Sequence, residues 1–166
     1  NNTEYIVNDQ NHVVKGIDRG DTAAFLGIRY ARGERFKKPV LEPLAAEVTA
    51  TKYGDGCPQL RQFFDESKSK SKTDMLYYTE FRKGLSFTYS EDCLNLNIFV
   101  PKNAENLPVL LYIHGGAFVI CSSDERPFDG KEIAKEGVIC VTANYRLNVF
   151  GYNADEGAQN LAFYDM

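Results

Sequence analysis

Several features that define other protein classes are missing from this chain of 166 residues. No apolar run approaches the ~18 residues of a transmembrane helix, so no transmembrane segment is expected. The four cysteines show no CxxC spacing, so no metal site is expected. Lys and Arg number 19 against 23 Asp and Glu, and a net charge of −4 gives no reason to expect nucleic acid as a partner. The chain also has no tryptophan.

Two kinds of catalytic signature are missing as well. Neither GxxxxGK(S/T) nor GxGxxG occurs, which argues against the usual phosphate-binding loops. None of the seven serines stands in a GxSxG context, so these residues encode no nucleophile elbow. The first residue is Asn1 and no signal peptide is visible, so targeting cannot be read from this sequence.

The apolar residues follow patterns typical of an α/β protein. Two short strand patterns within 5–17 flank the turn "NDQN" and predict an antiparallel hairpin. Residues 94–100 alternate between apolar and polar, which predicts a strand with one buried face. The continuous apolar runs 109–113 and 138–145 predict strands covered on both faces, and a short helix within 128–137 joins them. Strand, helix and strand form a βαβ unit, so we expect a mostly parallel central sheet behind the N-terminal hairpin.

Residues 61–90 are the most polar part of the chain. The stretch "DESKSKSKTD" lacks apolar periodicity and is rich in serine and charge. Such composition is typical of an exposed loop. We therefore expect an exposed loop or a mobile excursion with a solvated face.

The stretch "LPVLLYIHGGAFV", residues 107–119, ends a buried strand on two glycines. In open α/β sheets, ligands bind at the carboxyl ends of the strands. Glycines there allow unusual backbone angles and let N–H groups approach a ligand closely. Such a turn serves as an oxyanion hole in lipases and esterases, or it is a plain tight turn that needs glycine. The sequence favours the oxyanion hole.

Several motifs in order resemble the type-B carboxylesterase/lipase family, the cholinesterase-like α/β-hydrolases. "SEDCLNLNIFVP", "HGGAF" and "NYRLNVFGY" carry most of the resemblance, and "AAFLGIRYA", "RFKKP", "YGDGCPQ" and "QNLAFYDM" extend it over nearly the whole chain. The resemblance implies an α/β-hydrolase fold and a bacterial-type carboxylesterase. It further implies that residues 1–166 are the N-terminal part of a single catalytic domain whose remainder lies outside this chain.

The chain departs from the family pattern at a few positions. Ala117 replaces the third glycine of the turn but keeps its N–H group. Arg29 stands where the family usually has Pro, and Met166 where it has Gln. Cholinesterases bind choline through a Trp in the loop that their first disulfide closes. Because this chain has no Trp, nothing here offers a comparable cation–π contact, and a cholinesterase is not expected.

The resemblance implies a carboxylic ester hydrolase with a Ser nucleophile and no cofactor. Gly116 and Ala117 would donate backbone N–H groups to the oxyanion, and Gly115 would supply the bend. Phe118 is either a wall of the substrate pocket or a core aromatic. The triad would lie beyond Met166, so the isolated chain is expected to be inactive. Its partners would be a small-molecule ester and the rest of its own catalytic domain. The alternative is a catalytically inactive family member that acts as a binding or scaffold module.

The resemblance also implies structural roles for charged residues and cysteines. It pairs Arg residues with carboxylates, and we expect both pairs to be buried because a charge within apolar sequence cannot be buried alone. Secreted relatives join the two motif cysteines, whereas an intracellular protein would keep them reduced. We expect an intracellular protein, with secretion as the alternative, and free buried thiols at the other two cysteines. The residues are the pairs Arg35–Glu91 and Arg146–Asp165, the motif cysteines Cys57 and Cys93, and the free thiols Cys121 and Cys140.

Overall fold

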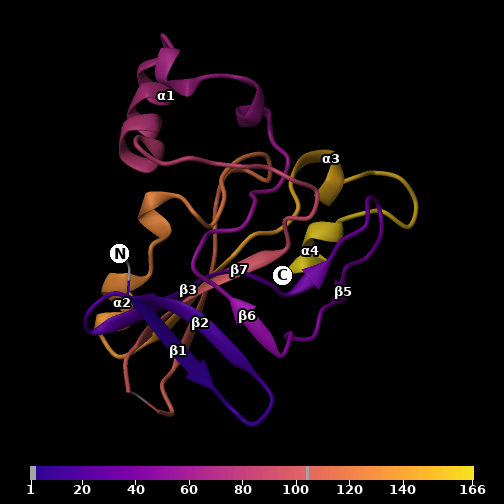
Figure 1. Cartoon of the computed structure of the whole chain (residues 1–166). Coiled ribbons are helices and arrows are strands. Elements are labelled where there is room, and N and C mark those ends of the chain that lie inside the picture. The colour runs from indigo at the N-terminus through magenta and orange to yellow at the C-terminus, as the bar shows by residue number, and fades with distance from the viewer. Residues whose placement is uncertain (1–2, 104) are drawn as a thin grey trace.

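A mixed β-sheet runs through the chain in the computed structural model, which describes residues 3–103 and 105–166. Its seven strands follow the order β1-β2-β3-β7-β9-β8, with β6 beside β2, and β4 pairs with β5 separately. Figure 1 shows the N-terminal strands β1, β2 and β3 on one side of the molecule below the helix α1. The strands are β1 Glu4–Asn8, β2 Val13–Asp18, β3 Thr22–Arg29, β4 Ala31–Arg32, β5 Val40–Leu41, β6 Glu47–Thr49, β7 Asn95–Pro101, β8 Val109–Ile113 and β9 Ile139–Ala143.

The N-terminal hairpin is the antiparallel pair β1 and β2, with Asn8 opposite Val13. The carboxylate of Asp9 closes its turn by accepting the N–H groups of Asn11 and His12, each at 2.7 Å. An Asp that satisfies backbone donors two residues on is the usual chemistry of such turns. The expected hairpin is therefore confirmed.

Parallel pairing in the main sheet is confined to β8 with β9 and to β2 with β6. The expectation of a mostly parallel sheet therefore holds here only for these two pairs. The pairs β1–β2, β2–β3, β3–β7 and β7–β9 are antiparallel. The turn between β2 and β3 is short, so these strands must pair antiparallel, because a parallel pair needs a crossover of a dozen or more residues.

Helix α2, Lys131–Lys135, covers one face of the sheet within the β8–β9 crossover. Its Ala134 packs in a buried cluster with Phe99 of β7 and Cys140 of β9. Gly137 ends the helix with a φ of 83°, a conformation that favours glycine. On the opposite face, a hollow of about 790 Å³ is lined by apolar side chains of β1, β2, β3 and β7.

Strand β8 lies at the edge of the sheet, and its five apolar residues are 41–63% exposed. The expectation of cover on both faces is thus wrong for the residues that the structure describes. The helix of the βαβ unit packs on β3, β7 and β9 and leaves β8 open. An exposed apolar edge strand is an adhesive surface that native proteins normally cover.

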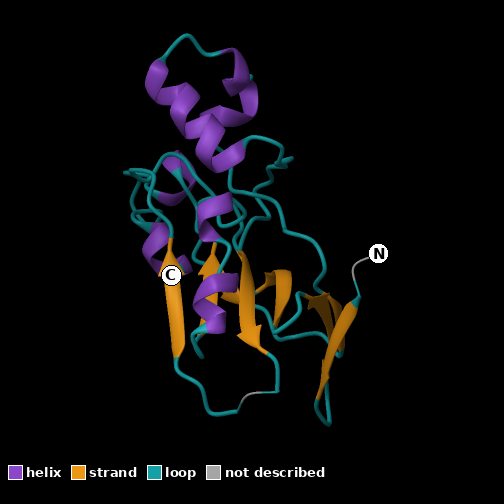
Figure 2. Ribbon diagram, turned by 90° about the vertical axis from the view of Figure 1, so that its left-hand side faces the viewer, coloured by secondary structure: helices purple, strands orange, loops and turns teal. Residues whose placement is uncertain are grey.

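Residues 60–90, which we call the excursion, form a helical cap over the end of the sheet where β8 and β9 finish (Figure 2). Ser71 caps the N-terminus of α1 by accepting the N–H of Asp74. The prediction of a solvated surface holds for most of residues 65–74 but is wrong at Glu66, which is buried and pairs with the buried Arg82. The helical elements are η1 Leu60–Phe63, η2 Glu66–Lys68, α1 Lys72–Tyr77 and the π-helical turn η3 Tyr78–Arg82.

The C-terminal segment packs beside the ends of the central strands. Leu147, Leu161 and Ala162 are fully buried there. A Cβ at Gly151 would overlap the backbone of Arg146, so glycine permits this close approach. The elements are α3 Asn148–Gly151 and α4 Leu161–Asp165, and the remaining helical turn is η4 Arg126–Phe128 in the crossover.

Candidate functional site

The glycine turn follows β8 directly, at the end of the sheet that the excursion caps. The N–H groups of Val119 and Ile120 both donate to the carbonyl oxygen of Gly116, at 3.1 and 3.2 Å. Gly116 has a φ of 123°, and a Cβ there would overlap the carbonyl of Ile120. Only glycine fits this position, so the turn is tight and closely packed.

Three successive N–H groups of the turn remain available. Within the described chain, the N–H groups of Gly115, Gly116 and Ala117 donate no hydrogen bond to another protein group. Ala117 and Phe118 have φ values of 53° and 66°, a left-handed conformation that costs about 1–2 kcal/mol per residue with a Cβ. Successive N–H groups in such a turn form an anion-binding concavity. Strain retained at such a place points to function.

His114 shapes this turn from beneath. Its side chain is buried, and its ring stacks on Tyr145 with centroids 4.5 Å apart. Nδ1 donates to the carbonyl of Gly115 at 2.8 Å, and the Tyr145 hydroxyl donates to the His114 carbonyl at 2.5 Å. Burial lowers the pKa of His114, which favours the neutral ring. The ring therefore holds the turn and is not placed as a general base.

A cavity of about 530 Å³ opens beside Gly115 and Gly116. It is mainly apolar, and the excursion contributes part of its wall. It differs from the larger hollow under the N-terminal strands, which lies away from the available N–H groups. The glycine-turn cavity is therefore the candidate site. Its aromatic lining residues are Tyr77, Phe81, Tyr112 and Phe128.

Phe118 lies outside this cavity. Its side chain is 54% exposed and contacts the ring of Tyr152, with centroids 4.7 Å apart. Its carbonyl oxygen accepts the N–H of Asn148 at 2.9 Å. Phe118 therefore belongs to no buried cluster among the described residues, and both roles, pocket wall and core aromatic, stay predictions.

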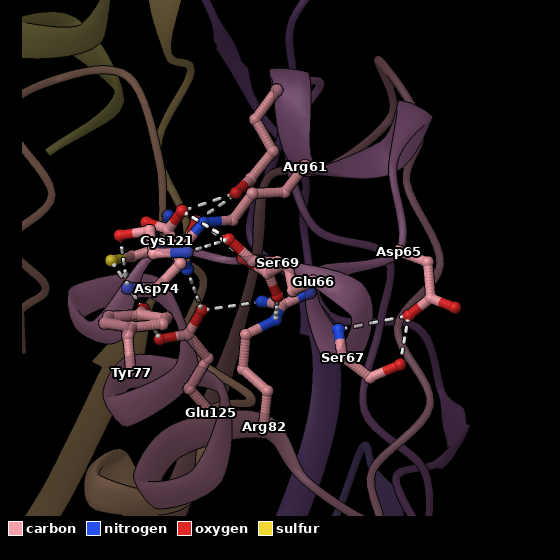
Figure 3. Close-up of polar contacts among 12 residues, drawn as sticks. Arg61, Asp65, Glu66, Ser67, Ser69, Asp74, Tyr77, Arg82, Cys121 and Glu125 are labelled. Atoms are coloured by element: carbon pink, nitrogen blue, oxygen red, sulfur yellow. Dashed lines mark hydrogen bonds and ion pairs between the residues drawn. The ribbon is translucent and has the colours of Figure 1, made fainter.

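A buried ionic cluster behind the cavity was not predicted from the sequence (Figure 3). Glu125 lies at its centre with a fully buried carboxylate. Nη1 of Arg82 donates to Glu125 at 2.7 Å, and the Tyr77 hydroxyl donates to the other carboxylate oxygen. Nε of Arg82 reaches Glu66 at 2.7 Å, and Nε of Arg61 reaches the same carboxylate at 2.9 Å. Burial raises the pKa of Glu125, and the hydrogen bond from Tyr77 and the charge of Arg82 oppose this.

Only a weak signal could have revealed this cluster. The excursion and the segment after the glycine turn are both polar, and neither shows apolar periodicity. The two segments neutralise each other's charges through the pair Arg82–Glu125, whose members are 43 residues apart in the sequence. The two aromatics Tyr77 and Phe81, one turn apart, were the visible hint of a buried face.

Asp124, next to Glu125, is a second buried carboxyl group. The Ser122 hydroxyl donates to it, and no salt bridge joins it to any cation in the described residues. Burial raises its pKa to about 6. This group therefore changes charge near neutral pH, close to the glycine turn.

The two expected ion pairs form but differ in exposure. Arg146 is buried against Asp165, with Nε–Oδ2 and Nη2–Oδ1 distances of 2.8 and 2.6 Å. Arg35 also pairs with Glu91, but their side chains are 58% and 37% exposed. The expectation of burial is thus wrong for Arg35–Glu91. Arg35 lies among Glu34, Phe36 and Lys37 in an exposed loop, which does not carry the guanidinium into the core.

The cysteines form one bridge and leave two thiols. Cys57 and Cys93 form a disulfide with their Cα atoms 5.0 Å apart, and it closes the excursion at its base. Cys121 and Cys140 are free and buried. Burial raises the pKa of both free thiols, so neither is primed as a nucleophile.

Two other kinds of site are absent from the described residues. No three His, Cys, Asp or Glu side chains are grouped so that they could hold a metal ion. Nor does the described chain contain a helix of the length and apolarity needed to cross a bilayer.

The comparisons with known proteins agree on one family. Residues 5–166 match the family described as "Carboxylesterase family". The chain is 39% identical over 157 residues to the para-nitrobenzyl esterase of Bacillus subtilis, which covers 90% of this chain and 29% of that protein. It is 34% identical to gut esterase 1 of Caenorhabditis elegans, over 84% of this chain and 23% of that protein.

Solved structures show the same relationship. A PNB esterase matches with a TM-score of 0.75 and 36% identity, over 98% of this chain and 33% of that structure. A thermophilic PNB esterase matches with a TM-score of 0.75 and 37% identity, over the same shares. The expected fold, an N-terminal part of the α/β-hydrolase fold, is confirmed. The chain spans a third or less of the length of these relatives, and it belongs to the carboxylesterase family.

Proposed function

We propose that residues 1–166 are the N-terminal part of a single catalytic domain that hydrolyses carboxylic esters of small molecules. This chain supplies the oxyanion-hole turn, Gly115, Gly116 and Ala117. The rest of the domain supplies the Ser nucleophile, its base and its acid. The observation that carries the proposal is the set of three available N–H groups beside an aromatic cavity.

The chemistry follows from the geometry of the turn. A serine hydroxyl attacks the ester carbonyl carbon while a base takes its proton, and the carbonyl oxygen becomes an oxyanion. The N–H groups of Gly116 and Ala117 stabilise that charge without rearranging, because β8 and the stacked His114 already fix the turn. The oxyanion then collapses, expels the alcohol and leaves an acyl-enzyme, which water hydrolyses.

The exposed strand β8 supports the placement of these residues in a larger domain. Its apolar side chains are 41–63% exposed, and its outer edge has no strand partner among the described residues. A further strand and its connecting helices would cover this surface. The relatives are about three times as long as this chain, which leaves room for such elements. The isolated 166 residues are expected to be inactive.

The test is hydrolysis of a p-nitrophenyl ester by the full-length protein and its Gly116→Ala variant. The added Cβ would overlap the Ile120 carbonyl and displace the donors. Since loss of one oxyanion donor costs about 10²–10³ in kcat, we expect a fall of at least about 10²-fold. The matched control is Gly20→Ala, where φ is also positive, at 85°, but no atom lies within 4 Å of the new Cβ.

Two results would contradict the proposal. One is wild-type kcat in a folded Gly116→Ala variant, which would make the glycines a plain turn. The other is a wild-type full-length protein that hydrolyses no ester of any size. Thermal unfolding midpoints of both variants separate loss of activity from loss of folding.

A catalytically inactive binding module is the second candidate. The observation in its favour is 38% identity over 140 residues to neuroligin-like protein glit-1 of Caenorhabditis elegans, over 77% of this chain and 17% of that protein. A fluorophosphonate probe that labels activated serines decides between the two. Covalent labelling of the full-length protein supports the hydrolase, and absence of labelling supports the binding module.

A further inference from the structure

The excursion reaches the glycine turn through one buried carboxylate. Glu125 follows the turn by eight residues and belongs to the same connection between β8 and β9. Tyr77, the last residue of α1, and Arg82, the last residue of η3, both donate to its oxygens. Figure 3 shows their side chains converging on Glu125.

The cluster is enclosed on the excursion side. The side chains of Arg82, Glu66 and Arg61 are only 6–10% exposed. Nη2 of Arg82 also donates to the Tyr89 hydroxyl at 2.6 Å. Charge-assisted hydrogen bonds of this kind fix the direction as well as the distance of their partners. The position of Glu125 is therefore set by several bonds from the excursion.

A second contact brings the same tyrosine to the turn itself. The Tyr77 hydroxyl lies 3.0 Å from Sγ of Cys121. The backbone of Cys121 is held by Gln59, which accepts its N–H at 3.1 Å and donates to its carbonyl at 2.9 Å. A Cβ at Gly116 would lie 3.0 Å from Cys121 Sγ. The strained turn is thus packed directly against the residue that Tyr77 and Gln59 fix.

We propose that Tyr77 and Glu125 are positioning residues for the oxyanion donors. Through them, the excursion fixes Cys121 and the backbone of Gly116 and Ala117 in the geometry that receives the oxyanion. This inference rests on the proposed ester hydrolysis and deepens it, because it assigns to the polar excursion a part in the rate of the reaction. The side chains of the excursion contact no oxyanion donor directly and act by fixing the backbone that carries the donors.

The physical reason lies in what a buried ionic cluster contributes. Such a cluster adds little net stability compared with apolar side chains of the same volume, because desolvation offsets the attraction between the charges. The cluster instead fixes the positions of the side chains that it joins. The turn needs this external support because Ala117 and Phe118 are strained and would relax to a different backbone if Cys121 moved.

The experiment compares Tyr77→Phe with Tyr78→Phe in the full-length protein. Tyr77→Phe removes the hydroxyl from Glu125 and Cys121 and keeps the ring that lines the cavity. Tyr78→Phe removes the same atom from the next residue, which is half-buried and contacts neither Glu125 nor Cys121 through its hydroxyl. Glu125→Gln is the second variant, because it keeps the shape of the side chain and removes its charge.

Two readouts are taken, kcat and KM for a p-nitrophenyl ester and hydrogen exchange of the amides in residues 113–121. Since small displacements of catalytic groups cost up to about 10²-fold, we expect kcat to fall about 10- to 100-fold in Tyr77→Phe with KM unchanged. Exchange in 113–121 should become faster. Glu125→Gln should change both readouts in the same direction, and Tyr78→Phe should change neither.

Other outcomes overturn the inference. Unchanged kcat and unchanged exchange in Tyr77→Phe would mean that the cluster only holds the excursion. A raised KM with normal kcat would make Tyr77 a substrate contact. If the wild-type protein hydrolyses no ester, the proposed function fails, and the exchange measurement alone decides the coupling. Faster exchange at the turn then supports the coupling, and unchanged exchange refutes it.

Discussion

Two buried arginines hold different parts of this molecule in different ways. Arg146 follows β9 and binds Asp165 of α4 with both its Nε and Nη2 atoms. It also donates to the carbonyls of Glu34 and Lys37, so it joins three segments of the framework around the sheet. Arg82 belongs to the excursion and forms ion pairs with both Glu66 and Glu125.

The two arginines differ in whether their burial can be predicted from the neighbouring residues in the sequence. Arg146 stands in "ICVTANYRLNVF", an apolar stretch that must enter the core and take its charge along. Arg82 stands in a polar segment, and its burial arises only where the excursion meets the turn after β8. A framework charge is thus recognisable from its neighbours in sequence. A charge between two polar segments is recognisable only from its neighbours in space.

Breaking the framework pair should have the largest effect on folding. Asp165→Asn leaves the Arg146 guanidinium buried without a counter-charge, so we expect the free energy of unfolding to fall by about 3–5 kcal/mol. Urea denaturation of the full-length protein measures this. The control is Glu91→Gln in the exposed pair with Arg35, where a change of about 0–1 kcal/mol is expected. Equal effects in the two variants would remove the distinction between buried and exposed pairs.

Opening the disulfide tests how far the excursion depends on its base. Closing the 36-residue separation between Cys57 and Cys93 should stabilise the folded state by about 4 kcal/mol on the chain-entropy model. Cys93→Ala should therefore lower the urea midpoint and raise hydrogen exchange in 60–90 more than in β7 and β9. In the wild-type protein, thiol counting under denaturing, non-reducing conditions should give two free thiols among residues 1–166. Four would show that the bridge is absent in the isolated protein, as expected of an intracellular compartment.

The buried carboxyl group of Asp124 gives a smaller effect that depends on pH. Its folded-state pKa of about 6 lies above the ordinary value of 3.8, so the folded state holds the proton longer than the unfolded state. Stability is therefore lost as pH rises from about 4 to 6, and the full cost, up to about 3 kcal/mol, applies above pH 6.

Asp124→Asn removes this cost, because the amide keeps an acceptor for the Ser122 hydroxyl without a charge. The variant should be more stable than the wild type at pH 7.5 and of equal stability near pH 4. Thermal unfolding across this range measures the difference. A difference that is the same at both pH values would show that Asp124 is ionised throughout, held by the cluster around Arg82.

The framework was largely predictable from the sequence. The alternation in 94–100 predicted strand β7 but not its buried face, because Asn95, Asn97 and Phe99 are buried and the apolar face is only half-buried. The apolar runs on either side of α2 predicted the parallel pair β8–β9. The position of the glycine turn at the end of β8 followed from the same runs. These patterns are local, since the periodicity of a strand and the freedom of a glycine are properties of a few consecutive residues.

The candidate site was only partly predictable. Sequence motifs identified Gly115, Gly116 and Ala117, but not the aromatic wall formed by Tyr77 and Phe81. That wall belongs to a segment whose composition is typical of a solvated loop. The excursion folds because its charges find partners in another segment, and a pattern within one segment cannot report such partners.

The sequence by itself determined the order of the strands along the chain, the strained turn that needs glycine and the family motifs. Tertiary structure alone decided which charges outside the apolar strand segments are buried. Arg35 and Arg146 were both expected to be buried, yet one is exposed and the other enclosed. Arg82 stands among polar residues and is enclosed as well. Burial depends on which distant elements pack over a side chain, and that packing exists only after the strands, the excursion and the turn have come together.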